Sequence, residues 1–211
     1  TLTTINSDAF KNCTSITSID LPDGLTHIYN SAFNGCTGIE SMVLPDSVQL
    51  IGPYAFQNCT SLNSINIPLS WNSASANYRD GYIFAGCSSL TSITVPEGMT
   101  SIPACAFQGA TYLKTVNLPA SLTSISNNAF ANCTSLTSVT IPASVTNIGS
   151  GVFYGTPWLD EQRQSTSFFI INNCLVDGTL CSGDVTIPKE ITKICSGAFK
   201  DNYMITSVTM S

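Results

Sequence analysis

Cysteine is the residue type with the clearest chemical potential in this sequence, because nine occur in 211 residues. Five of them recur three residues after a phenylalanine, and these are Cys13, Cys36, Cys59, Cys87 and Cys133. A thiol can form a disulfide, bind zinc or act as a nucleophile, and each of these requires a partner group. The sequence contains no C-x-x-C pair and a single histidine, His27. We therefore predict neither a zinc site nor another metal site.

Repeated positions of this kind lie one above the other when repeating units stack. Stacked strands are about 4.7–4.9 Å apart, and parallel side chains keep their Cβ atoms near that spacing, beyond the roughly 3.5–4.5 Å of a disulfide. We predict a ladder of buried, reduced thiols that pack as small apolar side chains. Cys105, Cys174, Cys181 and Cys195 lie outside this column. A Cys174–Cys181 or a Cys181–Cys195 disulfide remains open.

Other catalytic patterns are absent from the sequence. His27 occupies a position that is Ser124 or Asn147 in other repeats, so we interpret it as a solvated polar residue. One histidine excludes an H-E-x-x-H motif, and neither a G-x-S-x-G motif nor a phosphate-binding loop occurs. Asp23 and Asp46 share a repeat position that could form a weak calcium site, although turn formation explains aspartate there better. We predict a non-enzymatic protein without a cofactor.

A repeat of 23 residues must position all of these side chains. Its phenylalanine recurs at steps of 23, 23, 28, 23, 23, 23 and 46 residues, and the last step corresponds to two repeats. These residues are Phe10, Phe33, Phe56, Phe84, Phe107, Phe130, Phe153 and Phe199. A fixed period of this length is typical of a solenoid, in which each coil buries its apolar face against its neighbours. We predict one elongated domain over residues 1–211, with about nine coils.

One coil shows how the repeat is expected to fold. The alternation Val-Thr-Ile over residues 139–141 predicts a short strand with one solvated face. Pro142 should end that strand, because proline has no N–H for the ladder. The second half of the repeat, V-x-x-I-G over residues 145–149, turns a further aliphatic pair inward before a bend. We expect one 3₁₀ or α-helical turn to carry the Ala-Phe or Val-Phe pair, and the strands to line a concave surface.

Composition limits the partners that the domain can bind. Only 9% of the residues are charged, the formal net charge is −6, and the seven Lys and Arg residues are scattered. Binding to nucleic acid or to an anionic membrane requires a clustered basic face, so we expect neither. No apolar run approaches the roughly eighteen residues of a membrane helix, and we expect no membrane insertion by this segment. Because the chain begins and ends inside a repeat, we expect it to be a fragment of a longer protein.

The combined motif C-T-S-L-T-S-I-x-I-P-x-x-V-x-x-I-G-x-x-A-F, which recurs along nearly the whole chain, closely resembles the BspA-type bacterial leucine-rich repeats. The resemblance implies a right-handed leucine-rich-repeat solenoid of strands and 3₁₀ or α-helical turns, with a parallel concave β-sheet. It also implies a secreted or cell-surface protein of a host-associated bacterium, since some family members are adhesins. The implied partner is a protein, either a host extracellular-matrix protein or another surface protein.

The repeat is interrupted over residues 69–82, where the step is five residues longer and the V-x-x-I signature is missing. This segment contains Trp71, Tyr78, Arg79 and Tyr82. Loops on a rigid scaffold often carry binding residues, and Trp, Tyr and Arg are the usual energetic anchors of protein interfaces. We predict a protruding binding loop. The alternative is a tolerated insertion whose aromatic rings fold back over the core.

A second interruption, over about residues 157–181, replaces one coil. Residues 168–176 predict two strands joined by a tight turn at Asn172 and Asn173, because Asn tolerates positive φ. Trp158 and the polar residues 160–164 predict a short helix or loop beside these strands. We expect a degenerate coil here rather than a separate site.

The outward positions of the predicted strands form the most regular surface of the molecule. They are small and polar, and they are a second candidate binding site: Ser18, Asp20, Ser64, Asn66, Ser92, Thr94, Asn117 and Thr140. The concave sheet is the expected binding face of leucine-rich repeats, although this one lacks Trp, Tyr and Arg anchors. The sequence thus predicts a non-enzymatic protein-binding module, and the alternative function is a passive spacer that displays other domains.

Overall fold

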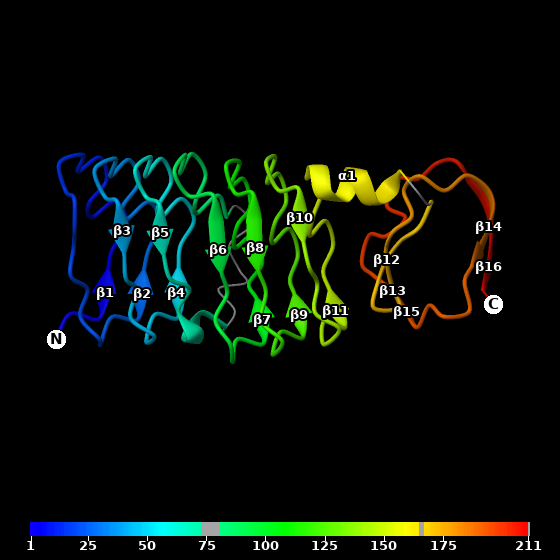
Figure 1. Ribbon diagram of the computed structural model, residues 1–211, viewed down its shortest axis with the longest axis horizontal. Coiled ribbons are helices and arrows are strands. Elements are labelled where there is room, and N and C mark those ends of the chain that lie inside the picture. Colours follow the sequence, from blue (N-terminus) through cyan, green and yellow to red (C-terminus); the bar gives the residue numbers. More distant parts are fainter. Residues whose placement is uncertain (73–80, 165–166, 211) are drawn as a thin grey trace.

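The computed structural model of the chain describes residues 1–72, 81–164 and 167–210, and it shows an elongated solenoid (Figure 1). The coils follow one another along the long axis from the N-terminal to the C-terminal end, with short strands arranged in two files. Eight coils carry the repeating Phe, and one degenerate coil lies between Phe153 and Phe199. The predicted solenoid of about nine coils is therefore confirmed.

Most coils contribute a first strand, with a polar outward side chain and an aliphatic inward one, which ends before the proline as predicted. The first strands are β3 (Ser41–Met42), β5 (Ser64–Ile65), β6 (Ser92–Thr94), β8 (Thr115–Asn117), β10 (Ser138–Val139), β14 (Gly183–Ile187) and β16 (Ile205–Met210). They pair in parallel as β3-β5, β6-β8-β10 and β14-β16. No strand forms at residues 18–20, where one was predicted.

The second half of the repeat also forms a strand, which the sequence did not predict. The second strands are β1 (Thr4–Ile5), β2 (His27–Ile28), β4 (Leu50–Ile51), β7 (Ser101–Ile102), β9 (Ser124–Ile125), β11 (Asn147–Ile148) and β15 (Lys193–Ile194). They pair in parallel as β1-β2-β4 and β7-β9-β11, while β15 pairs with the degenerate coil. Each has only two residues, which is too short for an alternating pattern to be recognised.

The Phe turn, defined as the repeating Phe with two residues on each side, closes each coil. In a regular coil the N–H groups at its first, third and fifth residues donate to the following coil, as Phe33 does to the carbonyl oxygen of Ala55 at 2.8 Å. The N–H groups between them bond three residues back within the same coil. The turn is not the helical turn that the sequence predicted, because its first and fifth residues have positive φ, for example 55° at Ser31 and 75° at Gly35.

The first position of the Phe turn also has positive φ and holds Ser31, Tyr54 and Cys105 in three of the coils. At the fifth position only Asn, Gly and Asp occur, which are the residues that adopt positive φ most readily. These residues are Asn12, Gly35, Asn58, Gly86, Gly109, Asn132, Gly155 and Asp201. A Cβ atom on Gly35 would collide with the side-chain oxygen of Asn12 in the preceding coil, and one on Gly86 would collide with that of Asn58. Asn and Gly accordingly alternate over the first four coils.

A continuous hydrophobic core runs through the stack from Ile5 to Cys195. The repeating Phe rings stack face to face from Phe10 to Phe153, with centroid separations between 5.2 and 5.9 Å. Beyond Phe153 the aromatic contact continues edge-on to Trp158 at 4.6 Å. The degenerate coil therefore extends the core with a different ring in a different orientation.

The degenerate coil contains the elements that the sequence predicted. Helix α1 (Pro157–Arg163) begins after Thr156, whose hydroxyl accepts the N–H of Leu159 at 3.2 Å and so caps the helix. Strands β12 (Phe169–Ile171) and β13 (Cys174–Asp177) form an antiparallel hairpin. Asn172 and Asn173 join them with φ values of 46° and 63°, as a tight hairpin turn requires.

Trp71 lies in the core, as the alternative of an insertion that folds back over the core predicts, and not on a protruding loop. Its side chain is 1% exposed, and its ring meets Phe107 edge-on at 6.1 Å. The backbone N–H of Trp71 donates to the carbonyl oxygen of Pro68 at 3.1 Å, as the backbone N–H of Val48 donates to Pro45 in the regular coil. Trp71 thus occupies the inward aliphatic column three residues after the proline. The extra residues of this coil come after the 3₁₀ helix η1 (Leu69–Asn72), and the strand pairing is interrupted there.

Replacing Trp71 by Ala should lower the free energy of unfolding by about 3–5 kcal/mol, because a large buried ring leaves a cavity. Leu69→Ala in the same 3₁₀ helix is the matched control, since Leu69 is 41% exposed, and it should change stability by less than about 1 kcal/mol. Urea denaturation followed by circular dichroism measures both. Equal losses in the two variants would contradict the buried position of Trp71.

Candidate functional site

The cysteine column forms the buried ladder that the sequence predicted. From the second coil onward each thiol of the column donates to the carbonyl oxygen of the Phe in the preceding coil. For example, Cys59 donates to Phe33 at 3.2 Å and Cys133 donates to Phe107 at 3.1 Å. All nine cysteines are free thiols, eight are buried, and Cys13 is partly buried. Burial raises the pKa of the Cys87 and Cys133 thiols to about 12. Since thiolate is the reactive form, these groups are poor nucleophiles.

The cysteines outside the column are not bridged either. The Cys181 thiol donates to the carbonyl oxygen of Ser167 at 3.2 Å, and burial raises its pKa, with Asp177 adding to the effect. The Cys174 thiol donates to the carbonyl oxygen of Thr146 at 3.5 Å. Burial, together with the neighbouring Cys174, raises the pKa of Cys195 to about 11. The disulfides that the sequence left open are absent from the described residues.

His27 lies in β2, where its partners in the neighbouring strands are Thr4 and Leu50. Its Nδ1 is 2.8 Å from the hydroxyl of Thr26, and its ring stacks on Tyr29 with centroids 5.8 Å apart. In the described part of the chain, no three His, Cys, Asp or Glu side chains gather closely enough to hold a metal ion. The expectation of no catalytic centre remains a prediction.

The Ser/Thr face, which we define by the eight predicted residues of the first-strand surface, lies along one side of the solenoid. All eight side chains are exposed. They line three shallow depressions of about 260, 480 and 260 Å³. The residues are Ser18 and Asp20 in the first, Ser64, Asn66, Ser92 and Thr94 in the second, and Asn117 and Thr140 in the third. The largest depression spans the place where β5 and β6 do not pair.

Asn66 has a structural role that the sequence did not reveal. Its side-chain oxygen accepts the N–H of Leu44 at 2.7 Å, and its side-chain nitrogen donates to the carbonyl oxygen of Leu44 at 2.8 Å. The amide thereby bonds to both backbone groups of a residue in the preceding coil. Asn117 similarly donates to the hydroxyl of Thr94 at 3.2 Å. The Asn side chains of the face are thus partly occupied by coil-to-coil bonds, whereas no hydrogen bond within the described part of the chain involves the hydroxyl of Ser64.

The residues of the predicted binding loop are not gathered on one surface in the described structure. Trp71 is buried, as described above, and Tyr78 and Arg79 lie outside the described residues. Tyr82 is half-buried at the first position of a Phe turn and stacks on Tyr54, its equivalent in the preceding coil, with ring centroids 6.1 Å apart. Counting back two residues from Phe84 would have predicted that position from the sequence.

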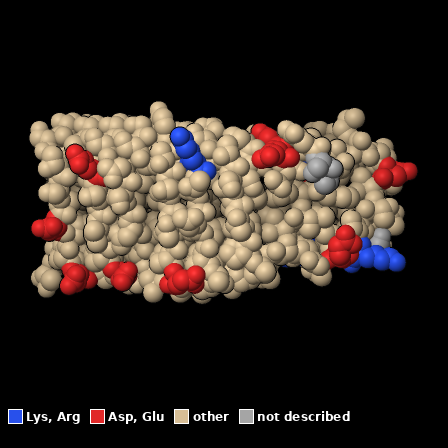
Figure 2. Space-filling model, in the orientation of Figure 1, with Lys and Arg blue, Asp and Glu red and all other residues tan. Residues whose placement is uncertain are grey.

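Charge is sparse on the surface. Figure 2 shows one face, on which Asp and Glu occur singly or in small groups near the edges and few Lys or Arg are visible. No basic cluster lies on this face. Within residues 1–72, 81–164 and 167–210, no helix has the length and apolar character needed to span a bilayer.

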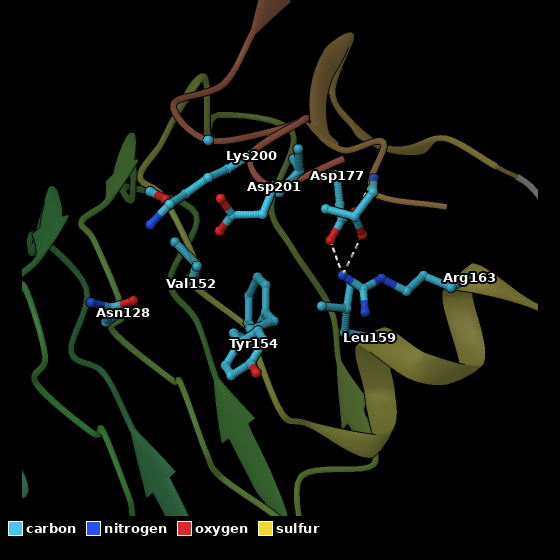
Figure 3. A pocket seen from close by; sticks show the side chains of 14 residues that line it. Asn128, Val152, Tyr154, Leu159, Arg163, Asp177, Lys200 and Asp201 are labelled. Atoms are coloured by element: carbon cyan, nitrogen blue, oxygen red, sulfur yellow. Dashed lines mark hydrogen bonds and ion pairs between the residues drawn. The ribbon is translucent and has the colours of Figure 1, made fainter. Parts of the chain in front are cut away.

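A deeper cavity of about 500 Å³ lies where the regular coils meet the degenerate coil. Its walls come from the Phe turn at 151–155, helix α1, strand β13 and the Phe turn at 197–201. Lys200 and Asp201 extend over the cavity from one side in Figure 3, with Tyr154 across from them. The sequence did not predict this cavity, because it arises from the relative position of two coils rather than from a motif.

Arg163 of α1 supports one end of this cavity. Its guanidinium forms an ion pair with Asp177 and donates to the hydroxyl of Thr179 at 3.2 Å. The carboxylate of Asp177 also accepts the N–H of Thr179 at 2.8 Å. The Nε of Arg163 is buried and has no hydrogen-bond partner among the residues that the structure describes. This network ties the end of the helix to the hairpin that follows it.

Comparison with known families identifies the repeat. Six copies of the family model described as "BspA type Leucine rich repeat region" match residues 1–79 and 78–206. The chain belongs to the BspA-type leucine-rich-repeat family. The regular coils before, between and after the two interruptions therefore belong to one BspA-type array, as the sequence motif indicated.

Solved structures of bacterial leucine-rich-repeat proteins have the same fold. A Eubacterium ventriosum protein is 27% identical with a TM-score of 0.58, over 74% of this chain and 41% of that one. The T. pallidum leucine-rich-repeat protein is 29% identical with a TM-score of 0.60, over 78% of this chain and 75% of that one. A Faecalibacterium prausnitzii leucine-rich cell-surface protein is 24% identical with a TM-score of 0.53, over 100% and 65%, and shows the fold alone.

This BspA-type domain thus spans less than half the length of the Eubacterium ventriosum protein. No curated protein sequence matches it. Family membership establishes the architecture, and the roles of the Ser/Thr face and of the cavity are therefore argued from their geometry below.

The thiol ladder predicts very slow reaction with an aromatic disulfide reagent at pH 8. Raised pKa values and burial keep the column protonated and inaccessible in the native protein, so partly buried Cys13 should react first. After denaturation without a reductant, all nine thiols should titrate. A count below nine would show that disulfides are present.

The double hydrogen bond of Asn66 predicts that Asn66→Ala lowers the free energy of unfolding by about 1–2 kcal/mol, since each bond contributes about 0.5–1.5 kcal/mol. Ser64→Ala is the matched control on the same strand and should change stability by less than about 0.5 kcal/mol. Urea titration measures both values. An unchanged midpoint for Asn66→Ala would show that the amide bonds are exchanged for water without loss.

Proposed function

We propose that this domain is a non-enzymatic protein-binding module of a secreted or cell-surface bacterial protein, and that the Ser/Thr face is its contact surface. The observation that carries the proposal is the arrangement of eight exposed polar side chains along three successive depressions of one file of strands. Rigid stacking fixes their spacing, so a partner that matches the spacing needs little ordering of this surface. The resemblance to surface-displayed family members supports the location.

Binding on such a surface depends on many weak contacts spread over a large area. Each hydrogen bond contributes about 0.5–1.5 kcal/mol, so several must form together to reach micromolar affinity, about −8 kcal/mol. Val43 adds an apolar contact, since it is 77% exposed and lines the first depression beside Ser18 and Asp20. The surface is low in charge, which favours a partner that presents hydroxyl, amide and backbone groups over a highly charged one.

Host extracellular-matrix proteins are the partner class that the resemblance suggests, and binding to them is the adhesion function that we propose. Another bacterial surface protein is the second partner class. A passive spacer between other domains would need no binding surface. The following experiment separates binding from spacing.

The triple variant Ser64→Lys, Thr94→Lys, Thr140→Lys should weaken binding to purified extracellular-matrix proteins at least about thirtyfold, the loss that corresponds to about 2 kcal/mol. Lysine there adds bulk and charge within two of the depressions. The matched control Gln49→Lys, Thr123→Lys, Thr146→Lys adds the same charge at exposed positions beside or within the second strands. It should retain binding within about threefold.

Surface plasmon resonance against each matrix protein, with serum albumin as the negative control, measures these affinities. Equal losses in both triple variants would move the contact surface away from the Ser/Thr face. Failure of the native domain to bind any matrix protein would reject the adhesion proposal and favour the spacer. Antibody labelling of intact source cells tests the surface location, and labelling only after lysis would contradict it.

A further inference from the structure

The hydrogen bonds between successive Phe turns stop at the degenerate coil. The Phe turn centred on Phe130 is fully paired, since Asn128, Phe130 and Asn132 donate to Ser150, Val152 and Tyr154 at 2.7–3.0 Å. The equivalent donors of the next turn are Gly151, Phe153 and Gly155. Their N–H groups have no acceptor among the described residues. By the geometry of the repeat, these groups point along the stack, away from the preceding coil.

At the first interruption of the repeat the next Phe turn packs differently. The N–H groups of the Phe turn centred on Phe84 also lack a described acceptor. However, the following turn packs directly against this one, because a Cβ atom on Gly109 would collide with the ring of Tyr82. The ring of Phe107 also stacks on Phe84 at 5.9 Å. These two turns are therefore in direct contact.

The unpaired N–H groups at the second interruption face a cavity instead. Gly151 and Phe153 both line the cavity of about 500 Å³ in Figure 3, and Gly155 continues the row beyond it. This volume lies within the roughly 300–1,000 Å³ of ordinary ligand sites. Donors two residues apart on one backbone edge match the carbonyl spacing of an extended peptide, which is how sheet edges recognise added strands.

The opposite wall offers a backbone acceptor. The turn at 197–201 has the same positive φ values as a regular Phe turn, 76° at Gly197 and 57° at Asp201, so its alternate carbonyl groups point back toward the preceding coil. The carbonyl oxygen of Ala198 accepts the N–H of Gly178 at 2.7 Å. That of Lys200, which lines the cavity, accepts no hydrogen bond from the described residues. The cavity thus has donors on one wall and a backbone acceptor on the other.

The side chains around the cavity favour a peptide over a small anion. Lys200 and Asp201 carry opposite charges and Asp177 is paired with Arg163, so the charged groups that line the cavity balance and do not concentrate positive charge for a phosphate or a free carboxylate. Leu159 and Val176 supply an apolar wall. A neutral backbone with one aliphatic side chain satisfies these groups better than a concentrated negative charge does.

We propose that this cavity binds a short extended segment of a partner protein. The segment's carbonyl oxygens accept hydrogen bonds from the N–H groups of Gly151 and Phe153, an aliphatic side chain lies against Leu159 and Val176, and a polar one faces Lys200 and Asp201. The turn at 197–201 already approaches the turn at 151–155 at one end, where a Cβ atom on Gly197 would collide with the hydroxyl of Ser150, and the segment occupies the open space beside that contact. This site is separate from the Ser/Thr face and does not depend on the function proposed for that face.

Hydrogen exchange followed by NMR tests the unpaired edge directly. In the free protein the amide protons of Gly151 and Phe153 should exchange at least about a hundredfold faster than those of Asn128 and Phe130, their paired equivalents, because unbonded amides need no opening of structure to exchange. Equal protection at both turns would overturn the proposal.

A random linear heptapeptide library displayed on phage provides the ligand probe. Peptides selected on the native domain and then synthesised should slow exchange at Gly151 and Phe153 at least about tenfold at saturation. Val176→Trp, which fills the cavity, should weaken their binding at least about tenfold, with Ser150→Trp as a second filling variant if the first fails to fold. Val43→Trp is the matched control, because Val43 is exposed elsewhere, and it should bind normally.

The triple lysine variant of the Ser/Thr face should bind the selected peptides as the native domain does, which separates this site from the proposed function. The proposal is overturned if no selected peptide protects the two amides. It is equally overturned if the cavity-filling variants and Val43→Trp bind the peptides alike.

Discussion

The hydrogen bonds that pass from one Phe turn to the next set the coil spacing on which the rest of the structure depends. They require positive φ at both ends of the turn, and the fifth position holds only Gly, Asn and Asp, whereas the first also holds Ser, Tyr and Cys. They also bring successive Phe rings into face-to-face contact at 5.2–5.9 Å. The carbonyl oxygen of the Phe itself stays free of this ladder, and it accepts both the N–H of the cysteine in its own coil and the thiol of the next, as Phe33 does from Cys36 and Cys59. Backbone pairing, ring stacking and the thiol column are thus all set by the same distance between successive coils.

Sequence reasoning predicted what is repeated and failed where one position departs from the repeat. The period, the first strands, the thiol column and the hairpin at Asn172 all follow from residue types that recur or from turn chemistry. Trp71 was interpreted as a loop residue because its size differs from the aliphatic residues of its column, yet its distance from Pro68 is that of Val48 from Pro45. In this fold the position of a residue within the repeat is therefore a better predictor of its burial than its residue type. The second strands were missed because two paired residues leave too short a pattern.

The candidate sites differ in how far they can be predicted from the sequence. The Ser/Thr face is the exposed side of a repeating pattern, so all eight of its residues could be named in advance. Even there, the bonds of Asn66 to Leu44 depend on a side chain reaching a neighbouring coil, which a pattern of residue types does not specify. The cavity beside Arg163 arises from the relative position of two coils, which no motif in the sequence specifies. Irregularity in a repeat protein is thus where sequence analysis is weakest and where a distinct site can form.

The alternation of Asn and Gly at the end of the Phe turn has a consequence for how such an array grows. Gly35 sits against the side-chain oxygen of Asn12, and Gly86 against that of Asn58. Deletion of the single coil that contains Gly35 would place Asn12 directly against Asn58, and one amide would have to leave its position. Loss or duplication of the two adjacent coils that contain Gly35 and Asn58 preserves every such contact. An Asn at this position therefore requires Gly in the following coil, whereas two Gly can follow each other, as Gly86 and Gly109 do. A single additional coil fits without repacking where it carries Gly, but not where it places a second Asn directly after the first.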